Sequence, residues 1–177
     1  MVRSLLVFIH VSSAMGVVGV LAIEGVFLLQ LRRAVNPSQV LIALNAFHVI
    51  PRVAIPSLLV TILSGTYLTA TVWGWRAAWI DVAFASLIAN AVIGATTIGP
   101  RIARAGKMLN ADDRRDPMLW VSFIIRTFIL VGIVFLMTVK PPLEAALIAM
   151  ATAGGAGLLA ALPFLTRRAS QDSMVSV

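Results

Sequence analysis

Long apolar stretches alternate with short polar ones along the whole chain. Five of them are long enough to cross a bilayer as helices, which takes about 20 residues. They are Leu5–Leu31, Val53–Val72, Ala77–Gly99, Met118–Val139 and Leu143–Leu165. The segment Ser38–Ile50 is moderately apolar and also predicted to be helical, and Pro51 and Pro56 are expected to bracket the entry to the second span. The pattern predicts an all-α integral membrane bundle of five transmembrane helices.

The composition supports a membrane protein and excludes several other classes. Of the 177 residues, 60% are hydrophobic and 12% are charged, whereas soluble domains are about 45–50% apolar and about 25% charged. Soluble enzymes and disordered or fibrous chains are therefore excluded. Cysteine is absent, which rules out disulfides and thiolate metal sites. The net charge of +7 comes mainly from basic residues at the span ends, so the expected partner is the lipid bilayer and not nucleic acid.

The basic residues also predict an orientation. Ten of them lie in the first-to-second loop, the third-to-fourth loop and the C-terminal tail, and three lie on the opposite side, with Arg126 left out because it is inside a span. The positive-inside rule places the ten in the cytoplasm. We therefore expect an external N-terminus and a cytoplasmic C-terminus. Residues 1–168 should form one transmembrane domain, a four-helix core plus a fifth helix, followed by a disordered cytoplasmic tail over Ala169–Val177.

Four ionisable residues lie inside the predicted spans, where such groups are costly and mark candidate functional sites. The predicted topology places His10 and Asp81 in an outer layer and Glu24 and Arg126 in an inner layer. His10 and Glu24 share one helical face, so both should point into the bundle. We expect Glu24 and Arg126 to form an intramembrane ion pair. The alternatives are a binding site for an anionic group and an arginine that extends alone to the headgroups.

His10 is the main candidate for binding a cofactor. A neutral imidazole in a helical bundle is a common axial ligand of haem. The alternative is a structural histidine, hydrogen-bonded to Asp81, Ser13 or a backbone carbonyl. A copper site with Met15 is a further alternative, although no methionine motif accompanies His10. His48 is expected at the opposite membrane face, so a single haem held by both histidines is disfavoured.

Small residues recur at every fourth position along the fifth span. The stripe consists of Ala145, Ala149, Ala153, Gly157 and Ala161. A stripe of this kind lets another helix approach closely. It should therefore either pack against a helix of the same chain or form the contact of a homodimer.

Several short motifs resemble those of a known family. The first span reads FIHVSSAMGVVGVLAIEG, the second has an arginine and prolines at its entry and ends in GTYLT, the third has a tryptophan-rich entry, and the fourth closes with VFLMTVKP. Over Leu5 to Pro141 the chain resembles a bacterial family of predicted integral membrane proteins of unassigned function. That family is distantly similar to the copper-resistance D membrane domain and to the HemJ-type protoporphyrinogen oxidases. The resemblance implies a bacterial inner-membrane location.

The resemblance also implies that His10 binds haem, because HemJ-type proteins carry a haem-binding histidine in the first span. Their essential lysine corresponds most closely to Asp81, and the third span here has no lysine, so an oxidase activity is not predicted. The expected function is binding of haem b or a related tetrapyrrole, with His10 as the axial ligand and Tyr67 or Asp81 as a nearby polar partner. The alternative is a non-catalytic transporter of a small molecule or metal, or a membrane assembly subunit.

Overall fold

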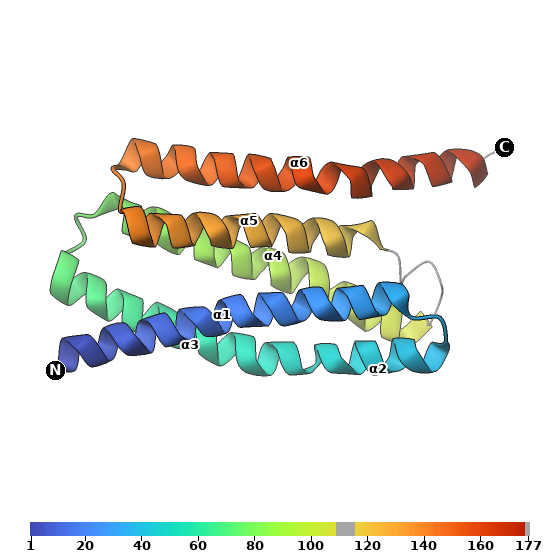
Figure 1. Ribbon diagram of the computed structural model, residues 1–177, viewed down its shortest axis with the longest axis horizontal. Coiled ribbons are helices and arrows are strands. Elements are labelled where there is room, and N and C mark those ends of the chain that lie inside the picture. The colour runs from blue at the N-terminus through green and yellow to red at the C-terminus, as the bar shows by residue number, and fades with distance from the viewer. Residues whose placement is uncertain (109–115, 176–177) are drawn as a thin grey trace.

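The computed structural model is built from helices (Figure 1). It describes residues 1–108 and 116–175, without the side chains of residues 37, 103–108 and 166–175. In chain order the elements are α1 (Val2–Arg33), α2 (Pro37–Phe47), α3 (Val49–Leu68), the π-helical turn η1 (Thr69–Trp73), α4 (Ala78–Met108), α5 (Pro117–Val139) and α6 (Leu143–Val175). Arg114 and Arg115, which contribute to the predicted orientation, lie outside the described residues, as do positions 176 and 177 of the expected tail.

Five helical segments of the described chain are long and apolar enough to cross a membrane. They are Val2–Arg33, Ser38–Trp73, Ala78–Ile102, Pro117–Val139 and Leu143–Leu165. Large apolar side chains such as Phe8, Leu63 and Val131 are exposed on the outside of the bundle. Water would disfavour so much exposed apolar surface, whereas lipid tails would not. The prediction of a helical protein with five segments long and apolar enough to span a membrane is confirmed for the described residues.

The second span begins earlier than predicted. Only His48 separates α2 from α3, so the segment from Ser38 onward belongs to the same candidate span. Pro51 lies in the first turn of α3, where a missing N–H is tolerated, and Pro56 lies inside the helix. The two prolines therefore do not bracket the entry to the span. A membrane helix can contain proline when neighbouring helices and local adjustments satisfy the freed carbonyl group.

The last helix is longer than predicted. α6 continues to Val175, so residues 169–175, expected in a disordered tail, are helical. The reason is visible in the sequence, because neither glycine nor proline interrupts residues 164–175. Polar composition alone does not end a helix.

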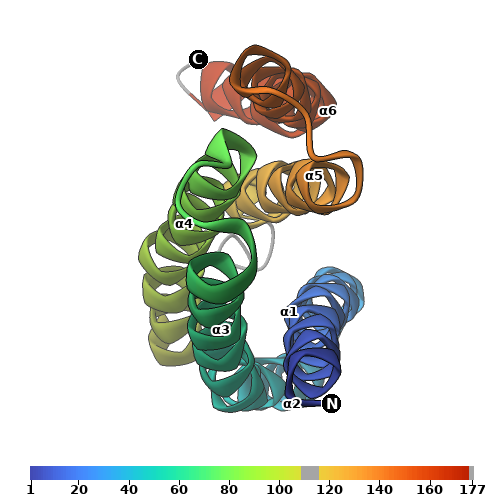
Figure 2. The ribbon, with the colours of Figure 1, turned by 90° about the vertical axis from the view of Figure 1, so that its left-hand side faces the viewer.

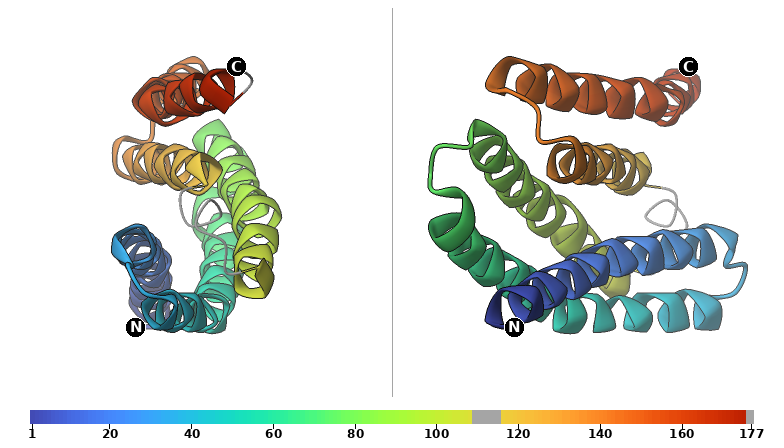
Figure 3. Two further views of the ribbon diagram at one scale, coloured as in Figure 1. Left: turned by 90° about the vertical axis from the view of Figure 1, so that its right-hand side faces the viewer. Right: turned by 60° about the vertical axis from the view of Figure 1, so that its left-hand side comes forward.

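The helices form two groups joined along α1 and α5. In the first group α1 packs along α3 and α2, and in the second α4 packs along α5, while α6 covers α5 on the side away from α1 (Figures 1 and 2). The oblique view in Figure 3 shows α4 crossing the bundle between α3 and α5. α6 contacts α5 and α4, which agrees with a four-helix core plus a peripheral fifth span.

The stripe of small residues on α6 faces α5. A Cβ atom added to Gly157 would lie 3.2 Å from the Cα of Ile125, and one added to Gly132 of α5 would lie 3.1 Å from the Cβ of Ala153. Ala161 is fully buried. The stripe thus packs within the chain, which was the first of the two expectations. A homodimer contact stays a prediction.

Candidate functional site: two adjoining cavities between the helix groups

His10 points from α1 toward α3. Its Nδ1 atom lies 3.1 Å from the carbonyl oxygen of Thr61 and 3.0 Å from the hydroxyl of Ser64. A carbonyl oxygen can only accept a hydrogen bond, so Nδ1 carries a proton and donates it. In the neutral imidazole the lone pair then resides on Nε2. Nε2 has no hydrogen-bond partner among the residues that the structure describes.

Small and hydroxyl-bearing residues surround His10 where α1 meets α3. The Ser13 hydroxyl donates to the His10 carbonyl at 2.9 Å and lies 2.9 Å from the Thr61 hydroxyl. A Cβ atom on Gly65 would lie 3.0 Å from Cε1 of His10, so the glycine leaves room for the imidazole. Similarly, a Cβ on Gly16 would lie 2.7 Å from the hydroxyl oxygen of Ser57. The close approach of α1 to α3 therefore depends on two glycines.

His10 lines a cavity of about 570 Å³, which we call the His10 cavity. Small-molecule sites in proteins typically measure about 300–1,000 Å³. The walls are largely apolar, with Trp79 and Phe84 from α4 and Met137 from α5. Arg3 and Lys140 also line the cavity. It therefore combines one imidazole, two cationic side chains and an apolar body.

The end of α5 positions Lys140. Its backbone is left-handed, with φ 53°, and its N–H donates to the Leu136 carbonyl at 3.0 Å. The two prolines that follow it cannot continue the helix. The Lys140 Nζ atom lies 4.5 Å from the ring centroid of Trp73, a cation–π contact. The turn between α5 and α6 thus brings a cation to the His10 cavity.

Asp81 and Tyr67 are not among the residues lining the His10 cavity, and both are exposed. The α4 residues that line it include Trp79, Ala83 and Leu87, and Asp81 lies off that face of the helix. The partners of His10 are therefore the Thr61 carbonyl and the Ser64 hydroxyl instead of Asp81 or Tyr67, and a contact with a backbone carbonyl is one that the structural alternative had also predicted. Depth in the membrane suggested proximity to Asp81, but the rotation of α4 about its axis directs that side chain elsewhere.

The structure brings Glu24 and Arg126 together, as the sequence analysis expected. The Nη1 atom of Arg126 donates to both carboxylate oxygens of Glu24 at 2.8 Å. The Glu24 side chain is 2% exposed and that of Arg126 is 13% exposed. A Cβ atom on Gly94 of α4 would lie only 2.7 Å from Cζ of Arg126. Gly94 therefore provides the space that the guanidinium occupies.

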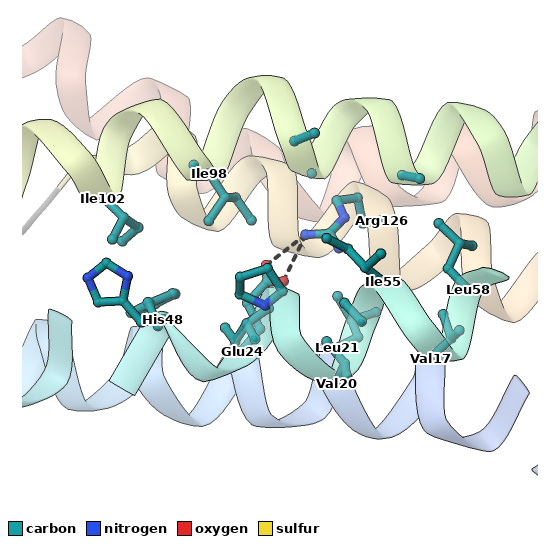
Figure 4. Close-up of a pocket in the computed structure, with 18 of the residues that line it drawn as sticks. Val17, Val20, Leu21, Glu24, His48, Ile55, Leu58, Ile98, Ile102 and Arg126 are labelled. Atoms are coloured by element: carbon teal, nitrogen blue, oxygen red, sulfur yellow. Dashed lines mark hydrogen bonds and ion pairs between the residues drawn. The ribbon is translucent and has the colours of Figure 1, made fainter. Parts of the chain in front are cut away.

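The ion pair lines a second cavity of about 700 Å³, the Arg126 cavity. Figure 4 shows Arg126 reaching toward Glu24 near the middle of the pocket, with His48 and Ile102 at one end and Val17 and Leu58 toward the other. His48 thus belongs to a different cavity from His10. Three apolar side chains line both cavities, namely Val17, Leu87 and Leu130. The two cavities adjoin along the boundary between the two helix groups.

Two buried polar atoms of the Arg126 cavity lack partners. Within the described part of the chain, Oδ1 of Asn90 and Nε of Arg126 have no hydrogen bond. Asn90 is only 4% exposed. The sequence analysis had not proposed a role for Asn90. One asparagine in an apolar span does not show which face of the helix is buried, so the sequence offered little indication that this side chain lines a cavity.

The metal-binding capacity of the described residues is limited. They contain no group of three or more His, Asp or Glu side chains able to hold a metal ion. Met15 lines the same cavity as His10, so these two side chains could serve as ligands of a copper ion. A haem needs only an axial ligand from the chain, because the porphyrin supplies the equatorial nitrogens. Among the described residues, the His10 cavity therefore offers the side chains of His10 and Met15 to a bare metal ion, and no cluster of three ionisable ligands.

Comparisons with protein-family models, curated proteins and solved structures found no match to this chain.

Proposed function

We propose that this protein binds haem b or a related tetrapyrrole in the His10 cavity, with Nε2 of His10 as the axial ligand. The observation that carries the proposal is the hydrogen bond from Nδ1 to the Thr61 carbonyl. Histidines that bind metals usually donate their other ring N–H to a carbonyl or carboxylate, which fixes the ring and increases the basicity of the ligating nitrogen. His10 has this arrangement, and it lines a cavity of ligand size.

The remaining walls also suit a tetrapyrrole. The largely apolar lining favours the macrocycle, and Arg3 and Lys140 offer charge partners for its carboxylate substituents. When bound, a haem supplies one-electron redox chemistry, tuned by the axial ligand and the surrounding apolar shell. The chain itself would hold the imidazole, pair the carboxylates and exclude water. The proposed location is the bacterial inner membrane, with the N-terminus outside.

The absorption spectrum of the purified protein tests this proposal. We expect a Soret band in the wild-type protein after mild detergent extraction or after haem is supplied. His10→Ala should abolish the band and added imidazole should restore part of it, because the imidazole can occupy the vacated ligand position. His48→Ala is the matched control and should keep the band, since His48 lines the other cavity. Folded wild-type protein that takes up no tetrapyrrole would refute the proposal.

A transporter is the second candidate, and one observation favours it. The His10 and Arg126 cavities adjoin at Val17, Leu87 and Leu130, so together they could form a path for a small molecule. This function predicts no Soret band. It also predicts that a bulky substitution at the boundary, such as Val17→Phe, blocks passage of solute into vesicles containing the protein.

A further inference from the structure

One nitrogen atom of Arg126 remains free to donate a hydrogen bond and is accessible. Nη1 donates to both carboxylate oxygens of Glu24, and Nε is fully covered by protein atoms. The third nitrogen, Nη2, has no hydrogen-bond partner among the described residues, yet it is not one of the fully covered atoms. It therefore keeps accessible surface, and the space that Arg126 lines is the Arg126 cavity.

The position of Arg126 along α5 puts this donor deep in the membrane. Arg126 lies nine residues after Pro117, the first residue of the helix, which is about 14 Å at 1.5 Å per residue. The hydrocarbon core of a bilayer is about 30 Å thick. Nη2 is thus near the middle of the hydrocarbon, away from bulk water and from phospholipid headgroups. An N–H without a partner is costly there, so an acceptor that reached it would be bound favourably.

The charges beside Nη2 favour a neutral acceptor. Glu24 already neutralises Arg126. A further anion would lie near the carboxylate of Glu24, in a site that is poorly screened by water. A group that only donates hydrogen bonds cannot pair with an N–H. A carbonyl oxygen accepts a hydrogen bond and carries no net charge, so it meets both conditions.

The size and the opening of the cavity favour a ligand that arrives from the lipid. One water molecule would satisfy Nη2 and leave most of the 700 Å³ unfilled. The described parts of α3 and α4 hardly touch each other, and the cavity lies between them (Figure 4). Ile55 of α3 and Ala95 of α4 line it and are exposed. The cavity is therefore open to an apolar molecule dissolved in the bilayer.

We propose that the Arg126 cavity binds a neutral, membrane-soluble carbonyl compound whose oxygen accepts a hydrogen bond from Nη2 of Arg126. The apolar body of the ligand lies against α3 and α4, beside Leu58 and Ile98. Glu24 holds the guanidinium through Nη1 and leaves Nη2 for the ligand. The site is separate from the proposed haem site, because His10 does not line it.

Binding of two radiolabelled probes, benzophenone and diphenylmethane, to the protein in nanodiscs tests the proposal. The probes have the same two rings, joined by a carbonyl group in the first and by a methylene group in the second. Empty nanodiscs are subtracted, and each affinity is referred to the concentration of the probe in the membrane. We expect benzophenone to bind about tenfold more tightly, the effect of one hydrogen bond of about 1.4 kcal/mol. Equal affinities, or no binding of either probe, would overturn the proposal.

A double variant tests the donor. Glu24→Leu combined with Arg126→Leu removes both charges, which can be nearly neutral for stability, whereas Arg126→Leu alone leaves a buried carboxylate without its partner. The double variant should bind the two probes equally, and its retained affinity for diphenylmethane would show that the cavity is still formed. A preference for benzophenone that survives in the double variant would overturn the proposal.

Two alanines of α4 test the location. Ala91 lines the Arg126 cavity, whereas Ala89 is exposed and lines neither cavity. Ala91→Phe should therefore weaken the binding of both probes, and Ala89→Phe, the matched control, should change neither affinity. Unchanged binding to Ala91→Phe would show that the probes bind elsewhere and would overturn the proposal. The protein is assayed without haem, so failure of the haem proposal would leave this result unaffected.

Discussion

At the residue scale, each candidate site contains an ionisable side chain that packs against a glycine, and the glycine makes room for it. Gly65 leaves space for the ring of His10, and Gly94 leaves space for the guanidinium of Arg126. Helical glycine is destabilising by about 1 kcal/mol relative to alanine. Its presence at these two contacts has a local steric reason, because a Cβ atom would collide with the functional group.

Gly65→Ala should weaken haem binding by displacing the ring of His10. The new Cβ atom would lie 3.0 Å from Cε1, so the imidazole must move by a few tenths of an ångström. Gly19→Ala is the matched control in α1, where nothing lies within 4 Å of the new atom. A haem titration followed at the Soret band measures the difference. Equal affinities for the two variants would contradict the assigned role of Gly65.

The Glu24–Arg126 pair predicts non-additive effects on stability. Arg126→Leu leaves a buried carboxylate without its partner, which costs about 3–5 kcal/mol, whereas removing both charges can be nearly neutral. Combining it with Glu24→Gln should therefore recover part of the loss. Thermal unfolding of both single variants and the double variant in detergent gives the comparison. Losses that simply add would show that the pair contributes no coupling.

At the element scale, the helices associate through small residues where close approach is needed. No general hydrophobic force drives two apolar helices together in lipid, so shape complementarity gains importance. The contact between α5 and α6 depends on Gly132 and Gly157, each with atoms of the other helix within 3.2 Å of its would-be Cβ. The fifth span is thereby attached to the four-helix core.

Gly157→Ala should weaken the attachment of α6. The added methyl group would lie 3.2 Å from the Ile125 backbone, and overpacking of this kind costs about 1–3 kcal/mol. Gly154→Ala, three residues earlier in α6, meets nothing within 4 Å and should be neutral or stabilising by up to about 1 kcal/mol. The thermal unfolding midpoints of the two variants are compared in the same detergent. A midpoint for Gly157→Ala that is no lower than that for Gly154→Ala would contradict the packing argument.

At the scale of the whole molecule, two helix groups enclose two cavities along their boundary. α1 with α3 forms one wall and α4 with α5 the other, and side chains from all four helices line both spaces. The N-terminus and the end of α6 lie at opposite ends of the bundle (Figure 1). That arrangement suits an odd number of membrane crossings.

Reporter fusions test the predicted orientation. A green fluorescent protein fused after residue 177 should be fluorescent, because the C-terminus is expected in the cytoplasm. Alkaline phosphatase fused after Arg76, in the turn between the second and third spans, should be active, because that turn is expected outside. Exchanging the two reporters should silence both. The same signal from both positions would contradict the five-span topology.

The sequence by itself determined the class of the protein, the number of spans and the pairing of two charges. A helix needs about 20 mainly apolar residues to cross a membrane. This requirement is local, so it can be read from the sequence without knowing how the helices pack. The pairing of Glu24 with Arg126 could also be predicted, because few groups can neutralise an arginine inside a membrane. Helix boundaries were less predictable, since Pro56 is tolerated inside α3.

Only the tertiary structure decided which side chains meet. Asp81 was expected beside His10 from its depth alone, yet the partners are Thr61 and Ser64 of α3. Depth follows from position along the chain, whereas lateral neighbours depend on which helices pair and how each rotates about its axis. For the same reason, the unpaired oxygen of Asn90 became visible only once α1, α3, α4 and α5 were placed around a common cavity.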